Sequence, residues 1–183
     1  DSQYSPSVAS FSNGGFVIAW DSNVQDGSGW GVYGQRFDVD GNKEGSEFQV
    51  NTYTDSHQQN IASSVAVLSD GGFVVTWRSM DQDGSGTGIY SQRYDSSGAK
   101  AGDEFQVNTY TAGAQDNAKN AALSDGGFVI VWNSEGQDGS GHGVYAQRYD
   151  SFGIKAGSEF QVNTYTASDQ GSASVAGLPG GGF

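Results

Sequence analysis

The sequence contains no cysteine and only 2 prolines, and its 8 lysines and arginines face 21 aspartates and glutamates. Without cysteine the chain can form neither disulfides nor thiolate metal sites. The formal net charge of −13 argues against nucleic acid or an anionic membrane surface as a partner. No apolar run approaches the ~20 residues that a bilayer-spanning helix needs, so membrane insertion is not expected either.

Glycine is abundant, with 29 residues, and aromatic residues make up 13% of the chain. The motif Gly-Gly-Phe ends at Phe16, Phe73, Phe128 and Phe183, which are 57, 55 and 55 residues apart. A fixed period of this size indicates one supersecondary unit used repeatedly. We therefore divide the chain into repeat 1 (1–56), repeat 2 (57–111), repeat 3 (112–166) and the start of a truncated repeat 4 (167–183).

The residue pattern predicts four short strands in each repeat. In repeat 2 these strands span 64–68, 73–77, 88–95 and 104–110. Val, Ile, Phe, Tyr, Trp and Thr dominate these runs, and Gly, Asp, Asn and Ser separate them. Four antiparallel strands in about 55 residues, repeated in tandem, predict an all-β fold of β-propeller blades. A β-solenoid or a string of small sandwiches is the alternative. Because three blades and a fraction cannot close the usual ring, we expect further repeats or other chains to complete it.

A tryptophan ends the second strand of every repeat. It could stack against a sugar ring, but burial of such a side chain contributes about 1.5–3 kcal/mol, so a core position is favoured. The arginine of each third strand is expected to be a structural donor to the carboxylate of a neighbouring Asp or Glu. These side chains are Trp20, Trp77 and Trp132, and Arg36, Arg93 and Arg148.

The recurring Gln-Asp-Gly-Ser-Gly segment between the second and third strands is the best candidate for a binding site. In repeat 2 the preceding residue makes it Asp81-Gln82-Asp83-Gly84, which is similar to the opening of calcium loops. Asp81 and Asp83 are therefore the candidate metal ligands, and Ca²⁺ is the one cofactor that the sequence suggests. Alternatively, the aspartates cap turn amides with their carboxylates. The shared aspartates are Asp26, Asp83 and Asp138.

One position changes between two glycines that stay constant, and it is occupied by Trp30, Thr87 and His142. A variable side chain on a constant frame is typical of ligand selection, but also of an unconstrained surface position. The chain has no phosphate loop and no nucleophile elbow. Its acidic residues repeat instead of forming one unequal pair, so we do not expect an enzyme.

Three motifs recur in the repeats: Gly-Gly-Phe-Val-x-x-Trp, Gln-Asp-Gly-Ser-Gly-x-Gly-x-Tyr-x-Gln-Arg and Glu-Phe-Gln-Val-Asn-Thr-Tyr-Thr. Together they resemble the tandem repeats of very large secreted bacterial proteins, the RTX-type adhesins and related surface proteins. The resemblance implies an extracellular or cell-surface location and a non-enzymatic scaffold or adhesive role. The calcium-binding nonapeptide Gly-Gly-x-Gly-x-Asp of that group is absent. The alternative is a lectin-like propeller, with or without calcium, whose weak sites gain avidity by repetition. The expected partners are glycans, other surface proteins and other copies of the repeat.

Overall fold

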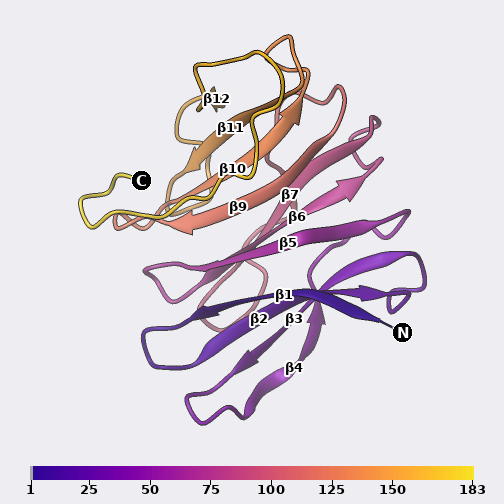
Figure 1. Cartoon of the computed structure of the whole chain (residues 1–183). Coiled ribbons are helices and arrows are strands. Elements are labelled where there is room, and N and C mark those ends of the chain that lie inside the picture. Colours follow the sequence, from indigo (N-terminus) through magenta and orange to yellow (C-terminus); the bar gives the residue numbers. More distant parts are fainter. Residues whose placement is uncertain (1) are drawn as a thin grey trace.

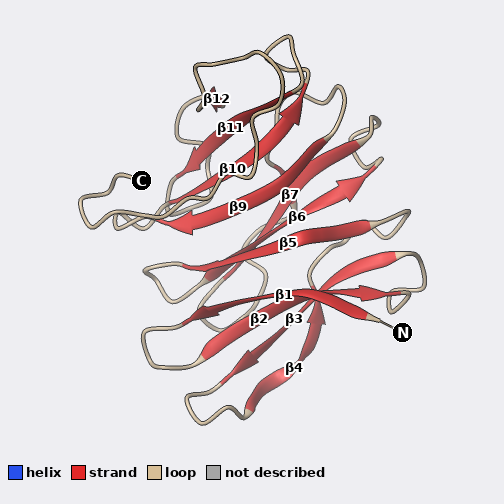
Figure 2. Ribbon diagram, viewed as in Figure 1, coloured by secondary structure: helices blue, strands red, loops and turns tan. Residues whose placement is uncertain are grey.

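A computed structural model describes residues 2–183, apart from the side chains of residues 59–63. Within residues 2–183 all regular structure is strand, with no helix (Figure 2). The described residues therefore contain no candidate for a membrane-spanning helix. Twelve strands form three antiparallel four-stranded sheets, each ordered as in the sequence (Figure 1). The first sheet contains β1 (Gln3–Ser10), β2 (Phe16–Asn23), β3 (Trp30–Phe37) and β4 (Lys43–Gln49); the second β5 (Gln58–Val67), β6 (Phe73–Met80), β7 (Thr87–Tyr94) and β8 (Phe105–Gln106); the third β9 (Gln115–Ala122), β10 (Phe128–Glu135), β11 (His142–Tyr149) and β12 (Phe160–Gln161).

The prediction of an all-β chain of four-stranded antiparallel units is confirmed, and the three sheets do not close into a barrel or ring. Two predicted strands differ from the structure. The fourth strand has only two residues in the second and third sheets, where 104–110 and its counterpart were predicted. The segment 174–178, which matches the predicted first strand of the other repeats, forms no strand. A strand exists only where a neighbour completes its hydrogen bonds, and no described strand pairs with 174–178, although Val175 packs against the core of the third sheet.

The turns between the first two strands of each sheet share one construction. In the second sheet, the Leu68 N–H donates to Gly72 O at 2.8 Å, and the Gly72 N–H donates to the Asp70 carboxylate at 2.9 Å. Gly71 has φ +84°, a conformation that glycine adopts without a Cβ penalty. The Asp-Gly pair therefore sets the hairpin, as the sequence predicts.

Aromatic side chains hold neighbouring sheets together. Phe48 of the first sheet packs against Tyr94 of the second at 5.1 Å between ring centroids. Phe105 makes the same contact with Tyr149 of the third sheet at 5.3 Å. The first strands of the three sheets, β1, β5 and β9, lie side by side through the middle of the molecule (Figure 1). The sheets thus repeat one interface twice.

The tryptophans confirm the core interpretation in two repeats of three. Trp77 and Trp132 are fully buried between sheets. Trp20, at the same position of the first sheet, is only half-buried. The difference follows from the arrangement, because another sheet packs against Trp77 and against Trp132, whereas within residues 2–183 no sheet packs against Trp20.

Buried tyrosines predict a loss of stability at alkaline pH. Burial, and secondarily the charges of Asp83 and Glu104, raises the pKa of Tyr90 from 10.0 to about 12. Burial also raises the pKa of Tyr94 and Tyr149. A raised folded-state pKa gives stability that is complete below pH 10 and is lost as the pH rises through the folded pKa. We expect the free energy of unfolding, measured with urea, to fall between pH 10 and about 12. A value that stays constant across pH 10 would contradict this assignment.

Candidate functional site

The aspartates of the Gln-Asp-Gly-Ser-Gly loops cap their own turns. One carboxylate oxygen of Asp83 accepts the Ser85 N–H at 3.1 Å, and the other lies 3.3 Å from Gln106 Nε2. Asp26 and Asp138 make the corresponding turn contacts at 3.1 and 3.2 Å. The loop therefore has a defined path in each repeat, and its aspartate is already engaged.

Asp81, the other candidate calcium ligand, contributes backbone contacts to the same loop. Its N–H donates to Gly86 O at 2.8 Å, and its carbonyl accepts from Gly84 at 3.2 Å. Its φ is +61°, unusual for a residue other than glycine. Among the described residues no group of three or more His, Cys, Asp or Glu is placed to hold a metal ion. Calcium binding by Asp81 and Asp83 stays a prediction.

The variable position is used differently in each repeat. The Trp30 ring tilts against Tyr4, with 5.4 Å between centroids. Thr87 is buried, and its hydroxyl donates to Gln115 O at 3.0 Å. The His142 N–H donates to Asp169 at 2.9 Å. Each residue opens the third strand of its own sheet, so the structure does not bring the three together, and their ligand-binding role stays a prediction.

A polar crevice of about 600 Å³ lies where the second sheet meets the first. It is lined by residues from four segments that are up to 52 positions apart in the sequence. Its side chains include two carboxylates, an ammonium group, two amides and a hydroxyl. The lining residues are Thr52, Gln82, Gln92, Lys100, Gly102, Asp103 and Glu104.

Glu104 organises one side of this crevice. Its Oε2 accepts the Thr52 N–H at 2.7 Å and the Thr52 hydroxyl at 3.1 Å, so it ties the second sheet to the first. Its Oε1 accepts Gln82 Nε2 at 2.7 Å. Lys100 Nζ donates to Val50 O at 3.0 Å, and burial lowers the pKa of this ammonium group. The crevice thus combines a carboxylate acceptor with a partly desolvated donor.

Gln92 contributes an unpaired acceptor. The residue is fully buried, and its Nε2 donates to Arg93 O and to Gly102 O, at 2.9 and 3.0 Å. Its Oε1 is buried and has no hydrogen-bond partner. An unpaired buried acceptor costs free energy, on the order of 1–3 kcal/mol, unless water or a ligand supplies a donor.

The same contacts recur where the third sheet meets the second. Glu159 accepts from Thr109 at 2.7 and 3.0 Å and from Gln137 at 2.6 Å. Lys155 Nζ donates to Val107 O at 2.9 Å. Gln147 is fully buried, and its Oε1 also lacks a partner. The chain therefore carries two equivalent sets of crevice residues.

The crevice was not predicted from the sequence, although Glu104 and Glu159 stand in the recurring Glu-Phe-Gln-Val-Asn-Thr-Tyr-Thr motif. The signal available was a lysine four residues before each glutamate, at Lys100 and Lys155. The threonines that bind Glu104 and Glu159 lie 52 and 50 residues away in the preceding repeat. Only the packing of the sheets brings each threonine into contact with its glutamate.

The arginines act as structural donors to carboxylates, as predicted. Arg36 pairs with Glu44 at 3.2 Å, and Arg148 pairs with Asp125. Arg93 lies 3.9 Å from Asp70. The aspartates that directly follow the third strands bind backbone amides of their own turns instead; they are Asp38, Asp95 and Asp150.

No family model matches the chain, and no curated protein matches it. Among solved structures, it is similar to an endo-arabinase from Bacteroides thetaiotaomicron (14% identity, TM-score 0.49), a match that covers 91% of this chain and 58% of that chain. It is also similar to a fucose lectin from Kordia zhangzhouensis in complex with methyl-fucoside (13% identity, TM-score 0.47; 88% and 99% covered). A protein of unknown function from Dyadobacter fermentans follows (12% identity, TM-score 0.36; 84% and 67% covered). At this similarity, the ligand and the reaction are properties of those proteins alone.

Proposed function

We propose that the chain is a non-catalytic carbohydrate-binding module with one site at each boundary between neighbouring sheets. The observation that carries the proposal is the unpaired, buried Oε1 of Gln92 among the residues that line the crevice. Gln147 has the same unpaired atom in the equivalent set, and so does Gln35 at the corresponding position of the first sheet. The recurrence of the unpaired acceptor in all three sheets indicates a shared role, because each such buried acceptor on its own would reduce stability.

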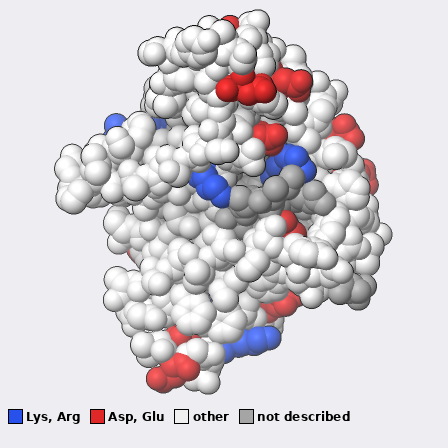
Figure 3. All heavy atoms as spheres, viewed as in Figure 1, with Lys and Arg blue, Asp and Glu red and all other residues white. Residues whose placement is uncertain are grey.

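The mixture of donors and acceptors favours a ligand with hydroxyl groups. The free oxygen of Gln92 needs a donor, the Lys100 ammonium group has protons for an acceptor, and a hydroxyl can serve both. An anionic ligand would meet Glu104 and Asp103 in a protein of net charge −13. On the face shown in Figure 3, lysines and arginines occur in small separate groups and form no continuous basic surface. A neutral sugar fits these groups best.

Nothing in the crevice points to catalysis. Both oxygens of Glu104 accept hydrogen bonds, from Thr52 and from Gln82. Glu159 is held in the same way by its own neighbours. These contacts occupy both oxygens of each carboxylate as hydrogen-bond acceptors, so neither oxygen is free to act on a substrate. We therefore propose binding without turnover.

The larger architecture is part of the proposal. Successive four-stranded sheets that pack face to face, with their first strands side by side, are what consecutive β-propeller blades require. The resemblance to secreted RTX-type repeats supports an extracellular or cell-surface location and an adhesive role. Repeated weak sites on one rigid body would then give avidity for a glycan-covered surface.

Removal of the crevice ammonium groups is expected to weaken glycan binding strongly. The variant Lys100→Met/Lys155→Met loses one charged donor per crevice, and the apparent affinity should fall about 10-fold or more, since a hydrogen bond to a charged group contributes about 1.5–3 kcal/mol. Glycan-array binding, followed by titration of the best sugar, measures the change. Lys43→Met is the matched control, because Lys43 holds the same sequence position but is exposed on the first sheet. Equal binding by all three proteins, or binding to no glycan, would refute the site.

A pure scaffold is the second candidate function. It is favoured by the contacts of Thr52 with Glu104 and of Thr109 with Glu159, which join the sheets without any ligand. In that case the Lys100→Met/Lys155→Met variant would lose stability while the parent protein binds no glycan. The same array and a urea unfolding curve separate the two functions.

A further inference from the structure

A second cavity adjoins the polar crevice at the boundary between the first and second sheets. It has a volume of about 300 Å³ and is lined by residues of both repeats. Lys100 lines this cavity as well as the crevice, so the two lie side by side. We call it the Arg36 cavity. The lining includes Arg36, Glu44 and Phe48 from repeat 1 and Tyr94, Ser97 and Lys100 from repeat 2.

Tyr94 lies between the crevice and the Arg36 cavity. It lines the cavity, and burial raises the pKa of its hydroxyl, as does the charge of Glu104, which lines the crevice. That hydroxyl is buried and has no hydrogen-bond partner. The Nε of Arg36 is also buried and unpaired, although other nitrogens of this guanidinium bind Ser97 O and Glu44. The cavity therefore holds two unpaired groups, each of which a ligand hydroxyl can satisfy.

The packing of the sheets does not need the Tyr94 hydroxyl. The Tyr94 ring stacks on Phe73, with 4.5 Å between centroids and 7° between planes. The first sheet has phenylalanine at this position, and Phe37 stacks on Phe16 in the same way, at 4.9 Å. The ring alone therefore makes the core contact. Because a buried hydroxyl without a partner costs free energy, its presence favours a contact with a ligand.

The same unpaired groups recur between the second and third sheets. The Tyr149 hydroxyl is buried without a partner, and burial together with the charge of Glu159 raises its pKa. The Nε of Arg93 is unpaired as well, while another nitrogen of Arg93 donates to Ser151 O at 2.7 Å. Each boundary thus carries the crevice residues and a second set of binding groups beside them.

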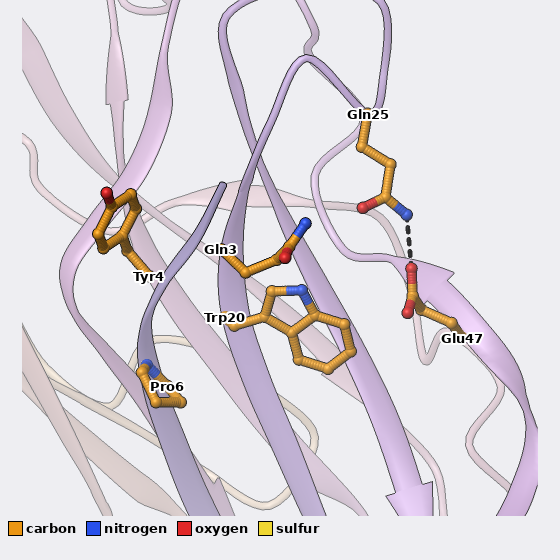
Figure 4. Close-up of a pocket in the computed structure, with 6 residues that line it drawn as sticks. All are labelled: Gln3, Tyr4, Pro6, Trp20, Gln25 and Glu47. Carbon is orange, nitrogen blue, oxygen red and sulfur yellow. Dashed lines mark hydrogen bonds between the residues drawn. The ribbon is translucent and has the colours of Figure 1, made fainter. Parts of the chain in front are cut away.

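The glutamates leave the ligand to these other groups. In the first sheet, Gln25 Nε2 donates to Glu47 Oε1, as the dashed line in Figure 4 shows. Gln82 and Glu104 repeat this bond within the second sheet, so the pair is a feature of the single sheet. At the boundary, Thr52 occupies the other oxygen of Glu104. A ligand in the crevice therefore meets the lysine and the unpaired groups rather than the glutamate.

We infer that each boundary binds a glycan of at least two neutral sugar units. One unit occupies the crevice beside Gln92, and the next occupies the Arg36 cavity, where Tyr94 and Arg36 bind its hydroxyl groups. Lys100 contacts both units. Because Arg36 is already paired with Glu44, an anionic sugar would gain little there. The same roles fall at the second boundary to Tyr149, Arg93 and Lys155. The inference rests on the proposed function and specifies its ligand.

Sugars of one and two units test the inference. The probes are the neutral monosaccharides of the glycan array, as methyl glycosides, and the disaccharides that contain them. In calorimetric titration of the parent chain, we expect the best disaccharide to bind about 10-fold more tightly than its methyl glycoside, since two further hydrogen bonds contribute on that order. Equal affinities would indicate a site for one unit and would overturn the inference, while the proposed function would stand. Binding of neither sugar would refute the proposed function itself.

The variant Tyr94→Phe/Tyr149→Phe removes only the two hydroxyls. It should lower the affinity for the disaccharide about 3- to 10-fold and leave the affinity for the methyl glycoside unchanged. Lys100→Met/Lys155→Met should weaken both, because Lys100 lines the crevice and the Arg36 cavity. Tyr165→Phe is the matched control, because its ring is 70% exposed, and it should change neither affinity.

Urea unfolding separates a ligand contact from a structural role of the hydroxyls. Neither hydroxyl has a partner within the protein, so Tyr94→Phe/Tyr149→Phe should keep or raise the unfolding midpoint. A lower midpoint with an unchanged affinity for the disaccharide would assign the hydroxyls to the fold and overturn the inference.

Discussion

Replacing Trp77 or Trp132 by alanine is expected to lower the free energy of unfolding by about 3–5 kcal/mol, the cost of a large cavity in a packed core. Both side chains are fully buried and belong to the clusters that join one sheet to the next. The loss should appear in urea unfolding curves as a lower midpoint. Because the cavity would lie between two sheets, it should also weaken the packing of one sheet against the other.

Trp20→Ala is the matched control for this series. It removes the same side chain from the same position of the first sheet, where the ring is only half-buried. Less apolar surface returns to water, so the loss should be clearly smaller, on the order of 1–2 kcal/mol. Equal losses at the three positions would mean that the interface between sheets does not supply the stability.

Gly127→Ala is expected to be a strongly destabilising small substitution. A Cβ at residue 127 would lie 2.3 Å from Tyr149 O, a backbone atom that cannot move without disturbing the pairing of β10 with β11. Gly72 faces Tyr94 O at 2.4 Å for the same reason. Overpacking of this kind costs about 1–3 kcal/mol, and thermal unfolding should report a lower Tm.

Gly180→Ala controls for the loss of glycine itself. No atom lies within 4 Å of a Cβ built at residue 180. Its effect should stay within about 0.5 kcal/mol, as for an ordinary surface change. If Gly127→Ala were as mild as Gly180→Ala, the close approach of the two backbones at Gly127 would be wrong.

Much of the fold could be predicted from the sequence because its determinants are local. The Asp-Gly pair at Asp70 fixes a hairpin through bonds within five residues. The alternation of strand and turn residues then gives four strands per repeat. The fourth strand was overestimated, since its length depends on pairing with β7 or β11 rather than on its own composition.

The candidate site could not be predicted, because its contacts are not local. The loop aspartates attracted attention as the most polar recurring group, yet Asp83 binds the amide of Ser85 two residues away. The crevice instead depends on Thr52 and Glu104, which come from different repeats. The buried oxygen of Gln92 can be recognised as unpaired only when every neighbour has a position.

Calorimetric stoichiometry is the sharpest test of whether each boundary between sheets is one sugar site. The best array glycan would be titrated into the chain at a protein concentration where sedimentation shows only monomer. The account predicts two equivalent sites per parent chain, one in Lys100→Met and none detectable in Lys100→Met/Lys155→Met. A single site per parent chain, or a stoichiometry that the lysine variants leave unchanged, would contradict it.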